Sequence, residues 1–222
     1  MDFTVTQRTR VRRAAKRASY DRATVEAILD EALVCHLAFV NDGHPFCIPT
    51  LHARVDDVVY VHGSAASRMI RTCQSGARAC LTVTIIDGVV LARSAFHHSM
   101  NYRSAMVLGA MHAVAEPAER GRALQAFTER LLPGRWDAVR PPNPKELKAT
   151  NVLAMPLAEA SAKARTGPPI DDDEDYALAV WAGVVPVGLA TGEPQPDAQL
   201  NPGVELPTHV TALHDRLSRD TH

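Results

Sequence analysis

The chain of 222 residues is poor in the features that mark several protein classes. Aromatic residues make up only 5% of it, and 24 Lys and Arg nearly balance 25 Asp and Glu, so that the formal net charge is −1. This balance argues against a general nucleic-acid binder. The longest apolar runs, such as residues 105–111, are far shorter than the roughly 20 residues that a membrane span needs. The sequence therefore predicts neither a nucleic-acid nor a membrane partner.

Cysteine is scarce and shows no metal-binding spacing. The four cysteines, Cys35, Cys47, Cys73 and Cys80, form no C-x-x-C pair and stand in strand-like surroundings. The N-terminus also lacks the apolar centre of a signal peptide. We therefore expect buried free thiols in a reducing cytoplasm, with metal ligands or disulfides as the alternative.

Length and charge distribution predict one main domain with an extension at each end. Residues 1–20 form a basic N-terminal arm with six Lys and Arg against one acid, Asp2. We interpret this arm as a solvated or partner-clasping tail, with nucleic-acid binding as the alternative. Residues 21–188 form the main domain. Residues 189–222 form a Pro-rich C-terminal extension that ends in a short amphipathic helix.

Apolar spacing changes from helical to strand-like after the first helix, which Asp21 caps. Helices are predicted over residues 22–31, 64–76 and 117–132, with a helical turn at 146–150. Strands are predicted over residues 33–40, 46–55, 58–63, 77–86, 89–96, 102–115 and 151–163, and residues 180–187 are again apolar. Asp42-Gly43 and Asp87-Gly88 are interpreted as hairpin turns. The fold class is therefore mainly β with flanking helices, an antiparallel barrel of six to seven strands.

A first polar cluster lies where the third strand gives way to a helix. His62 ends the strand, Gly63 allows a turn, and the helix begins within residues 64–67. Free backbone N–H groups and the helix dipole favour an anion at such a point. Ser64 and Ser67 add hydroxyl donors, and Arg68 adds a guanidinium suited to a phosphate. The alternative is a helix cap beside a surface arginine.

A second polar cluster interrupts the apolar pattern of residues 91–109. In a strand, Tyr102 and Ser104 share one face, from which Ser104 can contact a planar ligand, and Arg103 lies on the other, within reach of a phosphate or an acid. His97 and His98 precede this strand in a turn. Adjacent histidines diverge, and no Cys or acid stands at helical or hairpin spacing, so we expect no metal there. We expect one to fix the turn and the other to face a ligand pocket; the alternative is that both bond backbone carbonyls.

These segments resemble the pyridoxamine 5′-phosphate oxidase-like flavin-nucleotide-binding proteins, and the branch that includes nitroimidazole-resistance reductases most of all. The resemblance runs from about Arg8 to Pro202. It rests on seven segments in order: "YDRATVEAILDEALVCHLAFV", "HPFCIPTLHAR", "YVHGSAASRM", "DGVVLARSAFHHSMNYRSAMVLG", "PGRW", "EASAKARTGPP" and "WAGVVP". It implies the FMN-binding split β-barrel fold and FMN as cofactor.

The resemblance also implies roles for individual residues. The implied flavin-binding residues are Pro49, Thr50 and Leu51 along the isoalloxazine, His62, Gly63, Ser64, Ser67 and Arg68 at the phosphate, and Tyr102, Arg103, Ser104 and Trp181. Ser104 stands where the oxidases have a glutamine near the flavin. Trp181 resembles a tryptophan that is often contributed across a dimer interface, which implies a homodimer. His52 and His62 are both candidates for the histidine that the resistance reductases place near the flavin.

The C-terminal part of the chain departs from the oxidases in a way that argues against pyridoxamine-phosphate oxidase activity. Their C-terminal segment grips pyridoxal phosphate with Arg and His groups, whereas no Arg or His follows Trp181 until His209. We therefore expect an FMN-dependent oxidoreductase that passes electrons from NADH or NADPH to a small organic acceptor. His97, His98 and His52 are the candidate catalytic residues. The alternatives are a flavin-binding protein without turnover and a haem-binding or haem-degrading split barrel.

Overall fold

The computed structural model describes the backbone of residues 2–219 and the side chains of residues 2–213. The strands are β1 (Ala18–Ser19), β2 (Val34–Asn41), β3 (His44–Val55), β4 (Val58–Ser64), β5 (Ser75–Leu91), β6 (Ser99–Ala113), β7 (Thr150–Pro156), β8 (Ala160–Arg165) and β9 (Gly183–Pro186). The helices are α1 (Arg22–Glu31), α2 (Arg68–Cys73), α3 (Pro117–Leu131), α4 (Pro144–Ala149) and α5 (Thr208–Arg219), with short 3₁₀ helices η1 (Ala15–Arg17), η2 (Ala95–His97), η3 (Trp136–Ala138) and η4 (Asp173–Ala177). None of the described helices is both long and apolar enough to cross a membrane.

The strands form one antiparallel sheet that curls on itself. β6, β7, β4, β3, β2 and β5 pair in that order, and β5 pairs back with β6. The β6–β7 join consists of only two residue pairs. β1 and β8 extend the sheet beside β6, and β9 extends it beside β5. The predicted fold class, mainly β with flanking helices, is confirmed, with nine strands in place of six or seven.

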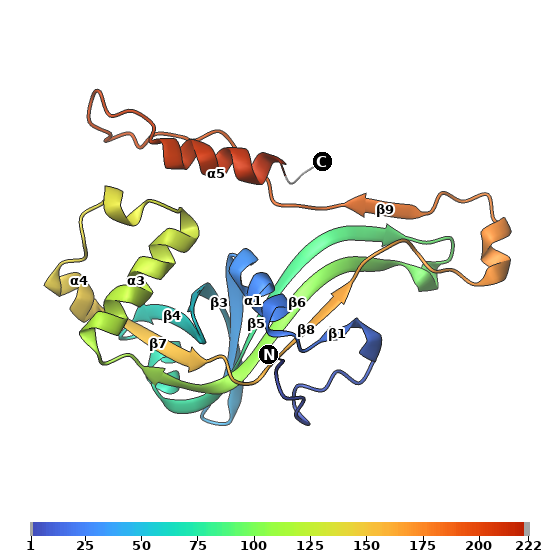
Figure 1. The fold of residues 1–222 in the computed structure, drawn as a ribbon, viewed down its shortest axis with the longest axis horizontal. Helices are drawn as coiled ribbons and strands as arrows, with labels where there is room; N and C mark the ends of the chain where they lie inside the picture. The colour runs from blue at the N-terminus through green and yellow to red at the C-terminus, as the bar shows by residue number, and fades with distance from the viewer. Residues whose placement is uncertain (1, 220–222) are drawn as a thin grey trace.

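The far parts of β5 and β6 project beyond the ring, together with β9 and the segment after β8 (Figure 1). We call this part, residues 86–102 with 166–187, the projecting hairpin. β9 pairs with β5 along the hairpin, from Gly88 to Leu91. The projecting hairpin therefore stands clear of the main core and presents side chains to its surroundings.

Alternation along the strands fills the ring with apolar side chains. On β2, Cys35, Leu37 and Phe39 are buried, and the residues between them are not. α1 closes one end of this core with Val25, Ile28 and Leu29, and the helix has the predicted bounds and the predicted Asp21 cap, which accepts a hydrogen bond from the Thr24 N–H. α3 packs on the outside of the sheet in a second cluster with Phe127 at its centre.

The prediction of a hairpin turn at Asp87-Gly88 is wrong. β5 continues through this pair as one strand, with a bulge between Ile86 and Gly88 in its pairing with β6. A Cβ at Gly88 would lie 2.8 Å from the Val184 side chain, so this glycine permits the close approach of β9. Glycine is favoured both in a turn and where another strand approaches the backbone closely. At Gly88 the close approach of β9 is the reason.

The predicted seventh strand over residues 151–163 is two strands, β7 and β8. Pro156 ends β7, because proline cannot donate a ladder hydrogen bond. The Leu157 N–H instead donates to the carbonyl of Asp57 at 2.7 Å. β8 then pairs with β6 and β1 on another part of the sheet.

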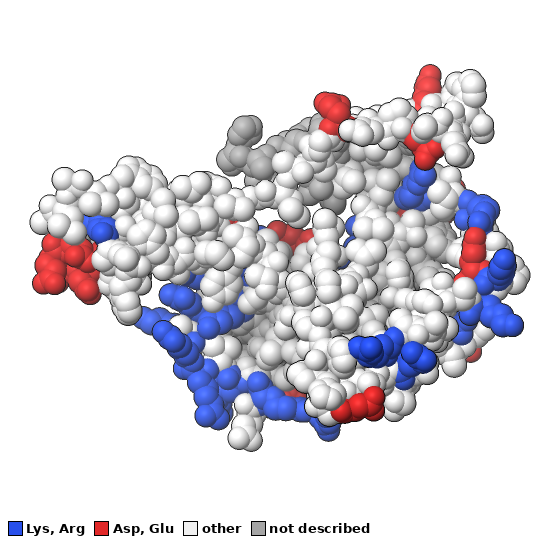
Figure 2. Space-filling view, turned by 180° about the vertical axis from the view of Figure 1, so that it is seen from behind, with Lys and Arg blue, Asp and Glu red and all other residues white. Residues whose placement is uncertain are grey.

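The basic N-terminal arm lies against the domain. Phe3 is buried in the main core, and its N–H donates to the Tyr20 carbonyl at 2.8 Å. Arg8 pairs with Glu159, which precedes β8. Seen from behind, Lys and Arg gather along the lower margin of the molecule, while acidic side chains gather at the tip of the projecting hairpin (Figure 2).

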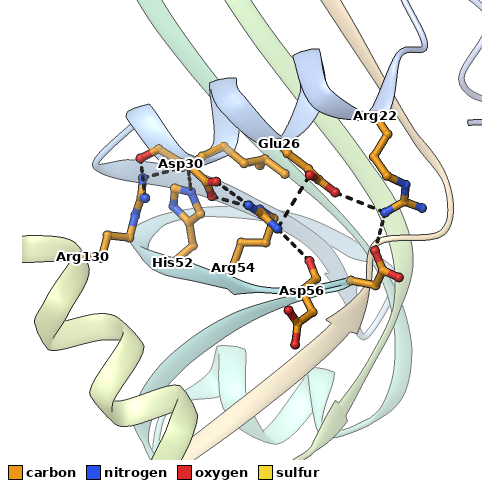
Figure 3. Close-up of polar contacts among 9 residues, drawn as sticks. Arg22, Glu26, Asp30, His52, Arg54, Asp56 and Arg130 are labelled. Carbon is orange, nitrogen blue, oxygen red and sulfur yellow. Dashed lines mark hydrogen bonds and ion pairs between the residues drawn. The ribbon is translucent and has the colours of Figure 1, made fainter. Parts of the chain in front are cut away.

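Two basic side chains hold the C-terminal end of α1 (Figure 3). Arg130 of α3 donates to the carbonyls of Asp30 at 2.6 Å and Leu29 at 2.7 Å, and also to that of Ala32. The fully buried His52 of β3 lies 2.8 Å from the Leu29 carbonyl through Nε2. Because a carbonyl only accepts, Nε2 carries the proton. These contacts satisfy the last carbonyls of α1 and tie the helix to β3 and α3.

Burial and the nearby Arg130 charge lower the pKa of His52 to about 4. The unfolded chain takes up this proton near pH 6.5. The unfolded state therefore binds more protons between these values, and the free energy of unfolding falls as the pH drops from about 6.5 to about 4.

We predict that His52→Gln removes much of this pH dependence. In the wild type, the drop from pH 7.5 to 4.5 is expected to remove on the order of 2.5 kcal/mol of stability through His52 alone. Urea denaturation at both pH values measures the difference between the two proteins. His44→Gln, at an exposed histidine of the same strand, is the matched control. Equal pH dependence in the wild type and His52→Gln would contradict this account.

Candidate functional site

β3 changes its partner halfway along, and this opens the sheet. Residues from His44 to Leu51 pair with β2 only, whereas residues from His52 to Val55 pair with β4 only. Alternate residues of an antiparallel strand direct both their N–H and C=O to one side. In the described structure, the first half of β3 thus has backbone groups on its second edge that no strand satisfies. Pro49, Thr50 and Leu51 lie on this half.

The turn between β4 and α2 lies on the other side of this opening. Ser67 caps α2, accepting a hydrogen bond from the Ile70 N–H at 3.1 Å. Ser64 accepts one from the Ala66 N–H at 3.3 Å. Both hydroxyl protons remain available to an acceptor, as do the N–H groups of Arg68 and Met69, for which no hydrogen bond is found in the described structure. The turn therefore offers several donors in one place.

Arg68 connects the two sides of the opening. Its guanidinium lies over the Phe46 ring of β3, 4.5 Å from the ring centroid. Phe46 in turn stacks on Phe39 of the core, with centroids 5.7 Å apart. The side chain of Arg68 is exposed, and within residues 2–213 it makes no ion pair. A guanidinium held on an aromatic face with its donors free is suited to bind a phosphate.

His62 lies next to the turn, near the end of β4. Its strand neighbour is Val152 of β7, because β4 pairs with β3 only as far as Val61. The half-buried imidazole packs on Phe127, with centroids 4.4 Å apart. Burial lowers the pKa of His62, which favours the neutral imidazole at pH 7. No hydrogen bond to its ring is found among the described residues. His52 is engaged at α1, so His62 is the histidine with nitrogens free for a ligand.

The second group of predicted residues lies elsewhere in the same chain. Tyr102, Arg103 and Ser104 are on β6, three strands from β3 along the sheet. Arg103 pairs with Glu31 and Asp87, so acids take its donors. The hydroxyl of Ser104 donates to the Lys163 carbonyl at 3.1 Å. A single chain therefore does not bring these residues to the opening beside β3.

Trp181 and the paired histidines belong to the projecting hairpin. Trp181 is 66% exposed, and its ring packs against Gly183. His98 lies 2.8 Å from the Ser94 carbonyl through Nδ1, a contact within the turn. His97 lies 3.2 Å from a carboxylate oxygen of Asp172. Neither histidine lies at the opening beside β3.

A shallow apolar depression on the outer face of the sheet was not predicted from the sequence. It has a volume of about 300 Å³, and Ala38, Val40, Pro45, Cys80 and Leu108 are among its lining residues. Outward residues such as Val34 and Val40 of β2 and Cys47 of β3 are exposed. The sequence signal for this depression is that both faces of these strands are apolar. A strand with one face in water has alternating apolar and polar residues.

Comparisons with known proteins identify the family. The sequence pattern of the pyridoxamine 5′-phosphate oxidase family matches residues 21–164. No match was found among curated proteins.

Two solved structures are similar in both sequence and fold. The flavocytochrome Anf3 from Azotobacter vinelandii is 42% identical, with a TM-score of 0.88 over 93% of this chain and 96% of that one. A protein from Mycobacterium smegmatis, described as binding FAD and haem, is 39% identical, with a TM-score of 0.84 over 88% of this chain and 96% of that one. A protein from Bacteroides thetaiotaomicron that is assigned by its description to 5-nitroimidazole antibiotic resistance shares the fold. It is 20% identical, with a TM-score of 0.56 over 66% of this chain and 85% of that one. The family match over most of the chain and the two relatives near 40% identity lead to one conclusion: the chain belongs to the pyridoxamine 5′-phosphate oxidase family.

Proposed function

We propose that the protein is a flavin-dependent oxidoreductase whose flavin binds at the opening between β3 and β4. The observation that carries this proposal is the juxtaposition of two kinds of group. Unpaired backbone of β3 faces the opening, and Arg68 with the Ser64 and Ser67 hydroxyls stands across it. A flavin nucleotide needs both, because its ring carries a row of donors and acceptors and its side chain ends in phosphate.

The residues have separate tasks in this proposal. Backbone groups of Pro49 to Leu51 orient the ring, and Arg68 and the two serines hold the first phosphate, which FMN and FAD share. The flavin itself supplies the redox chemistry. His62, whose lowered pKa favours the neutral imidazole, can accept a proton beside this opening. This assignment takes His62 in preference to His52, His97 and His98, which are bonded elsewhere.

Haem as an additional cofactor is the second candidate. Two relatives of about 40% identity are described as a flavocytochrome and as an FAD- and haem-binding protein. A phosphate turn argues against haem in place of a flavin, because haem needs no phosphate site. The two cofactors are compatible, since a haem takes a histidine as axial ligand and leaves the phosphate turn to the flavin. Exposed histidines such as His36, His44 and His112 are available.

The absorption spectrum of the purified protein tests both candidates. We expect flavin bands at about 370 and 450 nm, together with a Soret band if haem is also bound. Mass spectrometry of the released cofactor distinguishes the expected FMN from FAD. Bleaching of the flavin bands by NADH or NADPH without oxygen indicates the reductase. A protein that is purified without a flavin band and binds neither FMN nor FAD would contradict the proposal.

We predict that Arg68→Ala weakens flavin binding by about 1.5–3 kcal/mol, the usual contribution of a charge-assisted hydrogen bond. Fluorescence titration of the cofactor-free protein with FMN and with FAD measures the change. Arg71→Ala is the matched control, because Arg71 is an exposed arginine of the same helix. Equal affinities in Arg68→Ala and the wild type would remove the phosphate assignment.

We also propose a homodimer, because one chain leaves residues of the expected site apart. Tyr102 and Ser104 lie three strands from the opening, and Trp181 lies on the projecting hairpin. Apolar side chains of that hairpin are open to solvent, such as Phe96 at 89% and Ile170 at 72% exposure. Surfaces of this kind mark protein contacts.

We predict that sedimentation of the flavin-loaded protein gives a mass near twice 24.1 kDa. The double change Phe96→Ser with Trp181→Ser should shift the protein toward the monomer and reduce flavin affinity at the same time. A wild-type monomer that binds flavin tightly would refute the dimer.

A further inference from the structure

The tip of the projecting hairpin brings a histidine together with two carboxylates from a distant part of the sequence. His97 ends η2, in the connection between β5 and β6, whereas Asp172 and Asp175 belong to the segment that forms η4. One ligand atom from each residue lies within 4.8 Å of the other two. His97 Nε2 lies 3.2 Å from a carboxylate oxygen of Asp172.

Contacts on one side of these residues hold the two segments in register. The side chain of Asp171 is completely buried and accepts two hydrogen bonds from Arg93, one from the backbone N–H and one from the guanidinium, both of 3.0 Å. The same guanidinium lies over the Tyr176 ring, 4.8 Å from its centroid. Arg93 and Asp171 thus fix the chain just before the histidine and just before the two aspartates. The three ligand atoms therefore lie on two segments that the contact between Arg93 and Asp171 holds together.

The local charge is unbalanced at this point. Residues 171–175 are five consecutive acids, and Arg93 neutralises Asp171 alone. Of the remaining four, Asp172, Asp173 and Glu174 are exposed and Asp175 is half-buried. His97 is the one basic side chain that contacts Asp172 or Asp175 in the described structure. Acids so close repel one another, and a bound cation relieves that repulsion.

We propose that His97, Asp172 and Asp175 bind a first-row transition-metal dication, with zinc as the representative. An imidazole nitrogen with carboxylate oxygens suits this class, whereas calcium and magnesium take oxygen ligands. Three protein ligands leave at least one position for water or another ligand. The ion connects the β5–β6 connection to the segment that leads to β9, and so stabilises the tip that carries Phe96. Its three ligands are not among the residues to which the proposed flavin site assigns a task.

The expectation of no metal at His97 rested on local spacing. That spacing covers ligands at helical or hairpin distances only, whereas Asp172 contacts His97 from 75 positions further along the chain. A simple ion pair between protonated His97 and Asp172 accounts for the same 3.2 Å contact. In that case a proton occupies Nε2 where the proposed metal would bind. The two possibilities differ in how the protein responds to a metal ion.

Zinc titration of the chelator-treated, flavin-loaded protein by calorimetry distinguishes them at pH 7.5. We expect one zinc ion per chain at this site and a rise in the thermal midpoint on binding. His97→Gln and Asp175→Asn should each weaken zinc binding by at least about tenfold, the lower end of what even a supporting contact to a metal ligand contributes. His98→Gln and Asp173→Asn are the matched controls, one residue removed from the proposed ligands, and should bind as the wild type does.

Three results would overturn the proposal. One is the absence of zinc binding at millimolar concentration, which leaves the ion pair as the explanation of the contact. Another is equal zinc affinity in the wild type and His97→Gln, which indicates adventitious binding to other histidines. The third is equal weakening in His97→Gln and His98→Gln, which indicates a nonspecific effect on the turn.

Discussion

The change of partner along β3 is the constraint on which the rest of the structure depends. Its first half pairs with β2 and its second half with β4, so the ring of strands is open where the two halves meet. Backbone groups of the first half are thereby free, and the turn after β4 approaches them through Arg68 and Phe46. A fully paired β3 would leave no free backbone at this opening and would separate it from the donors of the turn.

Packing on either side keeps this opening in place. Arg130 and His52 bond the last carbonyls of α1, so that the helix is tied to the second half of β3 and to α3. α3 in turn contributes Phe127, on which His62 packs. Arg68 therefore faces the opening with its donors free, and His62 lies next to the turn. His52 supports the opening from behind.

Local features of the chain could be read from the sequence, and long-range contacts could not. α1 was predicted residue for residue, because its apolar spacing and its Asp21 cap are local. Asp87-Gly88 was misread as a turn, because the reason for Gly88 is the approach of β9 from 95 or more positions away. The turn between β4 and α2 was predicted from its residue types, whereas the partners of Arg103 and His97 are acids from distant segments. Spacing along the chain carries no information on such partners.

Hydrogen exchange with and without flavin tests the central claim most directly, because it reports both sides of the opening at once. Buried and bonded amides exchange slowly, and a ligand that bonds them slows exchange further. The account predicts that FMN or FAD slows exchange in residues 45–51 of β3 and in residues 64–70 at the start of α2 together. Protection that appears with tight flavin binding but spares both segments would contradict it.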